Sequence, residues 1–143
     1  MMSNIEDVLK EKGIYVTTTK GDSMEPMLSE GRDKVVIVVP KFPLKKYDIP
    51  VYRKMGHYTM HRIVRVKKNG YIICGDNRDS LEKNISDSDI IGVLAGFYQG
   101  EKYIDATDKE FLRYGKDAVK KLPLRLTKSY IKRGIRKVKR LFK

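Results

Sequence analysis

Cysteine, histidine and tryptophan are scarce or absent in this sequence of 143 residues. It contains one cysteine (Cys74), two histidines and no tryptophan. A lone cysteine excludes an internal disulfide framework and a cysteine-based zinc site, and it is typical of a reducing compartment. Cys74 lies in an expected strand, which favours a small buried apolar side chain over a catalytic thiol. We expect neither a metal ion nor another cofactor.

Long hydrophobic runs are also missing. The longest apolar run, residues 35–39, is far shorter than the roughly 20 residues that cross a bilayer. The first 13 residues carry acidic side chains and have no apolar core of signal-peptide length. We therefore expect a cytoplasmic protein that is neither secreted by that route nor threaded through a membrane.

Acidic residues are missing from the C-terminal segment. The formal net charge is +13, and residues 120–143 contain eleven Lys or Arg and no Asp or Glu. Residues 1–119 therefore carry a net charge of only +2. We expect a nearly neutral β domain over residues 1–106, followed by a basic helical extension over residues 107–143.

Short β-branched and aromatic runs, separated by Gly, Asn and Pro, occupy the first hundred residues. Asn69-Gly70 is the strongest hairpin signal, and it joins expected strands over 58–67 and 71–74. Further strands are expected over 14–18, 33–39, 51–54, 90–98 and 102–104, with a polar loop over 75–89. A short helix is expected over 4–12, capped by Ser3 or Asn4 and ended by Gly13, and helical sequence broken at Pro123 follows Thr107. The fold class is mainly β, a barrel-like or sandwich-like body of short antiparallel strands with terminal helices.

Three side chains can form a catalytic constellation. Ser23 lies in the loop Gly-Asp-Ser-Met-Glu-Pro-Met-Leu, which can expose a hydroxyl and leave backbone N–H groups unpaired. His61 lies within an expected strand, where packing can orient a general base, whereas His57 lies at a hairpin tip. Asp76 follows the strand that pairs with the His61 strand, so its carboxylate could hold the imidazole. Asp79 and Asp87 are alternatives for that role, and each of the three candidates also fits an ordinary loop or strand residue.

These residues resemble a known family. Residues 21–28 (GDSMEPML), then Tyr-x-x-His-Arg-Ile-Val over 58–64, then Gly-Asp-Asn over 75–77 look like the boxes of the type I signal peptidase and LexA-like peptidase superfamily. The resemblance covers roughly residues 14–98, and four boxes in order, with Tyr-Asp-Ile at 47–49 as the fourth, are more specific than any one. It implies a signal-peptidase/LexA-like β body and a serine peptidase that forms an acyl-enzyme, with Ser23 as nucleophile.

A histidine in the general-base box places the sequence with the Ser–His branch rather than the more common Ser–Lys type. The sequence departs from the family in three ways. It has no membrane span ahead of the serine box and no room there for a DNA-binding helix-turn-helix. Gly21 occupies the position two before the nucleophile, where many bacterial members place an oxyanion-binding hydroxyl. An oxyanion hole would therefore depend on backbone N–H groups, including that of Ser23.

Three functional hypotheses follow. The first is a serine endopeptidase that cleaves a peptide or leader sequence. The second is a catalytically degenerate module of the same fold that binds an extended peptide or docks on a membrane. The third, a basic regulator bound to nucleic acid, is disfavoured because the sequence has no DNA-reading element. The physiological substrate and the oligomeric state are left open.

The basic C-terminal segment has an amphipathic pattern. Ile131, Ile135, Val138 and Phe142 follow at steps of four, three and four, which places them on one helical face. Such a helix fits an anionic membrane surface, which residues 124–143 would contact at the inner face of the membrane, or an acidic partner. Packing of the apolar residues on the protein's own body is the alternative. Nucleic acid is a less suitable partner because phosphate contacts need no apolar stripe.

Overall fold

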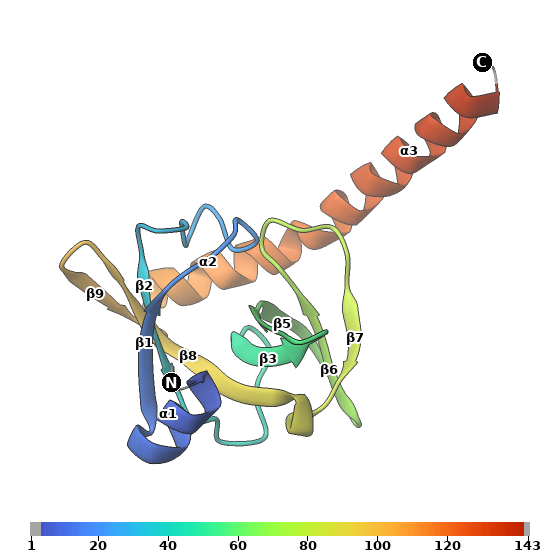
Figure 1. Cartoon of the computed structure of the whole chain (residues 1–143). Helices are drawn as coiled ribbons and strands as arrows, with labels where there is room; N and C mark the ends of the chain where they lie inside the picture. Colours follow the sequence, from blue (N-terminus) through green and yellow to red (C-terminus); the bar gives the residue numbers. More distant parts are fainter. Residues whose placement is uncertain (1–3, 142–143) are drawn as a thin grey trace.

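Two antiparallel sheets form the body of the computed structural model, which describes residues 4–141 (Figure 1). The larger sheet has the order β1-β2-β8-β3-β4, and β9 pairs with β8. Its strands are β1 (Ile14–Thr18), β2 (Lys34–Val38), β3 (Pro50–Lys54), β4 (His57–Met60), β8 (Ile90–Gln99) and β9 (Lys102–Asp105). The smaller sheet has the order β5-β6-β7, from β5 (Arg62–Lys67), β6 (Gly70–Cys74) and β7 (Glu82–Ile85). The predicted fold class, mainly β with terminal helices, is confirmed.

Local signals explain the first helix and the β5–β6 hairpin. The helix α1 (Ile5–Lys12) begins after Asn4, whose side chain accepts a hydrogen bond from Asp7 N at 2.8 Å. It ends at Gly13, whose φ of 75° is a left-handed conformation that favours glycine. The β5–β6 turn lies at Lys68-Asn69, where the Asn-Gly signal predicts it. Ser3, the alternative cap, lies outside the described residues.

Two predictions about strands are wrong in detail. The expected strand over 58–67 is divided at His61, because β4 joins the larger sheet and β5 the smaller one. The segment expected to be a polar loop contains β7 and a short 3₁₀ helix over Asp87–Asp89. β7 has no apolar alternation, and it forms by pairing with β6 rather than by burying one face.

The interior consists of two groups of apolar side chains. One lies between the larger sheet, α1 and the loop after β1, and includes Leu9, Leu28, Val35 and Phe97. The other lies around the smaller sheet and includes Tyr52, Ile63, Ile73 and Ile90.

The two C-terminal helices differ in how they pack. The helix α2 (Lys109–Lys120) is capped by Asp108 and places Phe111 in the first group, with its ring centroid 5.5 Å from that of Phe97. The helix α3 (Leu122–Leu141) extends away from the body (Figure 1). The expected break appears between the helices, and Pro123 lies in the first turn of α3, where its missing N–H costs nothing.

The apolar side chains of α3 do not pack on the body. Ile131, Ile135 and Val138 are each at least half exposed, which contradicts the packing alternative for these residues. Phe142 lies outside the described residues. Within residues 4–141, no helix has both the length and the apolar character needed to cross a membrane.

Candidate active site

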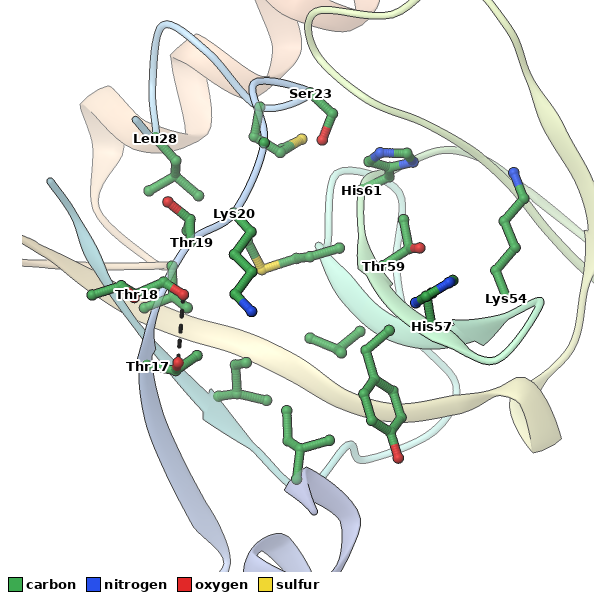
Figure 2. A pocket seen from close by; sticks show the side chains of 18 of the residues that line it. Thr17, Thr18, Thr19, Lys20, Ser23, Leu28, Lys54, His57, Thr59 and His61 are labelled. Carbon is green, nitrogen blue, oxygen red and sulfur yellow. Dashed lines mark hydrogen bonds between the residues drawn. The ribbon is translucent and has the colours of Figure 1, made fainter. Parts of the chain in front are cut away.

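Ser23 and His61 both line a cavity of about 880 Å³. Its walls come from the two end strands of the larger sheet, β1 and β4, and from the loop after β1. In Figure 2 the side chains of Ser23 and His61 lie at the same end of this cavity. The structure therefore brings together the two residues that the sequence singles out, although no direct hydrogen bond joins them within residues 4–141.

The loop that carries Ser23 is anchored by its apolar residues. Met24, Met27 and Leu28 are each at most 7 % exposed and belong to the larger core group. Burial of each such side chain stabilises the loop by about 1.5–3 kcal/mol. Ser23 itself is half-buried, so its hydroxyl remains accessible from the cavity. No hydrogen bond within the described residues uses the backbone N–H of Ser23, which leaves that donor available for an oxyanion.

His61 is held at the point where the chain passes from one sheet to the other. It is the single residue between β4 and β5, and its side chain is 13 % exposed. Both neighbours are fixed by strand pairing, since Met60 pairs with Val51 and Arg62 with Cys74. The break in the predicted strand therefore positions the imidazole at the cavity wall.

A short segment after β6 connects the two candidate residues. The carbonyl of Ser23 accepts a hydrogen bond from Asn77 N at 2.8 Å. A Cβ atom on Gly75 would lie 2.9 Å from that carbonyl oxygen and 3.2 Å from His61 Cδ2. Any larger residue at this position would push the serine loop and the imidazole apart. The Gly-Asp-Asn box thus has a structural purpose, which is close approach of the backbone to both residues.

Tyr52 and Glu82 contact the inner nitrogen of His61. Nδ1 lies 3.1 Å from the Tyr52 hydroxyl and 3.4 Å from Glu82 Oε1. The Tyr52 hydroxyl donates its single proton to Glu82 Oε2 at 2.8 Å, because a carboxylate is the stronger acceptor. The hydroxyl oxygen must then accept from Nδ1–H. This chain of hydrogen bonds fixes the tautomer and leaves Nε2 unprotonated, which is the state a general base requires.

The surroundings of His61 favour the neutral imidazole. Burial is the largest influence and lowers the pKa of His61 below its ordinary value of 6.5. The positive charges of Arg78 and Lys54 lower this pKa further, whereas Glu82 raises it. Burial together with Glu82 raises the pKa of Tyr52, so the phenol stays protonated.

Asp76 does not have the predicted contact with His61. Its two carboxylate oxygens accept hydrogen bonds from Arg62 Nε at 2.9 Å and Arg62 Nη2 at 2.8 Å. Both side chains are almost fully buried. The carboxylate therefore compensates the buried positive charge of Arg62, which would be costly without a partner. The alternatives also lie elsewhere. Asp87 accepts from the Tyr71 hydroxyl at 2.6 Å, and Asp79 is exposed beside α3.

Sequence reasoning missed Tyr52, Glu82 and the partner of Asp76. The sequence contained one signal for the pairing of Asp76 with Arg62. Arg62 lies between His61 and an apolar strand run, and a buried arginine requires an acidic partner. Glu82 gave no comparable signal, because it lies in a segment with neither apolar alternation nor a recognisable motif.

A protein-family model also matches this chain. The model of the family described as Peptidase S24-like matches residues 2–96, two thirds of the chain, and this range contains Ser23, His61, Tyr52 and Glu82. No curated protein matches the sequence. The chain belongs to the Peptidase S24-like family.

Proposed function

We propose that this protein is a serine endopeptidase, with Ser23 as nucleophile and His61 as general base. The observation that carries the proposal is that Ser23 lines the same cavity as an imidazole whose Nδ1 is held by Tyr52 and Glu82. A nucleophile, a base and a group that orients the base are the parts that acyl transfer needs.

The reaction would proceed in two halves. Ser23 Oγ attacks the carbonyl carbon of the scissile peptide bond while Nε2 of His61 accepts the hydroxyl proton. The proton then passes from Nε2 to the leaving amine, and the C–N bond breaks to give an acyl-enzyme. Water hydrolyses the ester by the same proton transfers, and the Ser23 N–H donates to the oxyanion in both halves.

An extended peptide is the substrate form that suits the cavity. β1 pairs with β2 alone among the described strands, so its other edge is open. That edge leads directly through Lys20 to the Ser23 loop, and residues from β1 line the cavity. A peptide that added to β1 as a further strand would pass beside the nucleophile.

Labelling with a β-lactone that acylates active serines tests the proposal. We expect one adduct on the tryptic peptide that carries Ser23, which disappears in Ser23→Ala and falls strongly in His61→Ala. Ser80→Ala, a change at an exposed loop serine, is the matched control and should keep full labelling. Profiling with a peptide library then gives the cleavage motif.

The alternative is a degenerate member of the same fold that binds peptide without cleaving it. The specific observation in its favour is the missing direct hydrogen bond between Ser23 and His61 within residues 4–141. Absence of both the adduct and any cleavage, with peptide binding retained, would establish this alternative and contradict the peptidase.

A further inference from the structure

The helix α3 carries a row of apolar side chains that are at least half exposed. Leu124 and Ile131 are each 56 % exposed, and Ile135 and Val138 are 50 % and 52 % exposed. We refer to these four residues as the exposed stripe. An α-helix of 20 residues is about 30 Å long, so the stripe forms an extended surface beyond the sheets.

The direction of the stripe is set by how α3 begins. Leu122 and Ser129 are the buried residues of α3, and they are where the helix touches the body. Successive residues turn by about 100°, so Leu122 and Ser129 project on the side opposite to Leu124 and Ile131. The stripe therefore faces away from the β body, and the body cannot cover it without a change in how the first turns pack.

All charged side chains of α3 are basic. No acidic residue occurs between Leu122 and Leu141. Lys128, Lys132 and Lys139 lie along one flank of the exposed stripe, from where their long side chains can reach charged head groups. The face opposite the stripe carries Arg133, Arg136, Lys137 and Arg140.

We propose that α3 docks on the surface of an anionic phospholipid bilayer, with the exposed stripe inserted among the acyl chains and the flanking lysines on the phosphates. An apolar stripe together with a polybasic flank supplies the two signals that reversible membrane binding needs. A second copy of α3 is the less suitable occupant, because pairing would bring two dense positive surfaces together without a compensating acid. Nucleic acid would leave the stripe exposed to water.

The same helix is connected to the catalytic segment, so docking would place the cavity beside the membrane. Arg125 Nε donates to the carbonyl of Arg78 at 2.9 Å, and Arg78 is ion-paired with Asp22 at 2.6 Å. Asp22 immediately precedes Ser23. The docking proposal does not require catalysis, since the contacts it uses lie outside the cavity.

Flotation of the full chain with lipid vesicles tests this proposal. One set of vesicles contains phosphatidylcholine alone, and the other an equal mixture of phosphatidylcholine and phosphatidylglycerol. We expect the protein to float with the anionic vesicles and to be released as salt is raised, because the lysine–phosphate attraction is screened. The triple variant Ile131→Ser, Ile135→Ser, Val138→Ser should lose about tenfold or more in partitioning.

A matched control separates this effect from a general loss of apolar surface. Ile14, Val39 and Val66 are aliphatic residues of the β body with similar exposure, at 45 %, 50 % and 43 %. Changing these three to serine should leave partitioning unchanged. Serine and isoleucine have similar helix propensities, so α3 should keep its helicity, which circular dichroism checks.

Four results would overturn the proposal. The first is that the wild type does not float with vesicles, and the second is that it floats equally well with neutral vesicles. The third is that the triple variant floats as well as the wild type. The fourth is that sedimentation velocity finds dimers that form through the exposed stripe and do not bind vesicles. None of these measurements involves a substrate. An inactive peptidase that still floats with anionic vesicles would leave the docking proposal standing and contradict only the proposed catalysis.

Discussion

At the level of single residues, the protonation of His61 depends on neighbours whose effects have opposite signs. Glu82 raises the pKa of His61, whereas burial, the largest influence, lowers it, and Arg78 and Lys54 lower it as well. Lys54 Nζ also lies 3.0 Å from Glu82 Oε1, so the carboxylate is shared between the lysine and the imidazole. This arrangement favours a neutral imidazole and keeps a negative charge in reach of the imidazolium that the proposed reaction would form.

The pH dependence of cleavage should follow from these charges. A base must be neutral to accept a proton, so kcat/KM should rise with pH through a midpoint below 6.5, the ordinary pKa of histidine. Glu82→Gln removes the charge that raises this pKa and should move the midpoint to lower pH. It should also reduce the rate by about ten- to a hundredfold, because a charge-assisted hydrogen bond contributes about 1.5–3 kcal/mol. Lys54→Gln should move the midpoint the opposite way, most clearly at low ionic strength, because Lys54 is half exposed.

Asp76→Asn is the control for this experiment. It breaks the buried pair with Arg62, so the free energy of unfolding should fall by roughly 3 kcal/mol. The midpoint of the pH profile should not move, because neither Asp76 nor Arg62 is among the influences on His61. Equal midpoints for all the variants would contradict a histidine base controlled by Glu82.

At the level of elements, α2 supports β5, the strand after His61, through Arg62. The guanidinium of Arg62 is held by Asp76 and packs over the rings of Phe111 and Tyr114, with its Cζ 5.6 and 5.8 Å from the ring centroids. Gly115 provides the space for it. A Cβ atom at this position would lie 2.4 Å from Arg62 Nη1, and the arginine cannot move aside because its carboxylate partner is buried.

Gly115→Ala should therefore destabilise the protein by about 1–3 kcal/mol, as expected for overpacking of an interior contact. The matched control is Gly134→Ala in α3, where an added Cβ meets nothing within 4 Å. That change should stabilise the helix by about 0.5–1 kcal/mol, because alanine has the higher helix propensity. Urea unfolding of both variants measures the difference, and two changes of the same sign would contradict the packing argument.

At the scale of the whole molecule, the basic extension consists of two unlike parts. α2 contributes Phe111 to the main core and encloses Arg62, whereas α3 beyond Ser129 is exposed along its length. The basic segment of the sequence begins at Lys120, whereas the part of the chain that no longer packs on the body begins after Ser129.

Two truncations should separate these parts. A chain that ends at Tyr130 should unfold cooperatively with nearly the same thermal midpoint as the full chain, because residues 131–141 are exposed. A chain that ends at Ala106 should lose cooperative unfolding, because removing α2 exposes core side chains and one side of a buried ion pair. Thermal unfolding followed by circular dichroism measures both. A stable, cooperatively folded chain over residues 1–106 would show that α2 is dispensable.

The sequence by itself determined the local features of this protein. β1, β2, β3, β6 and β8 lie within one or two residues of their predicted positions, because short apolar runs between turn residues are local signals. The cap at Asn4 and the hairpin at Asn69-Gly70 are local for the same reason. The approach of Ser23 to His61 could be expected from the family resemblance, but not from the spacing of the two residues alone.

Tertiary structure decided which acid faces the imidazole. Asp76, Asp79 and Glu82 all follow β6 within eight residues, and nothing in their local sequence distinguishes their partners. The choice is made by two long-range requirements. The buried charge of Arg62 needs a carboxylate and takes Asp76, and the pairing of β7 with β6 then carries Glu82 to Tyr52 and His61. Burial and strand pairing between distant segments are properties of the assembled fold, so only the fold could assign these roles.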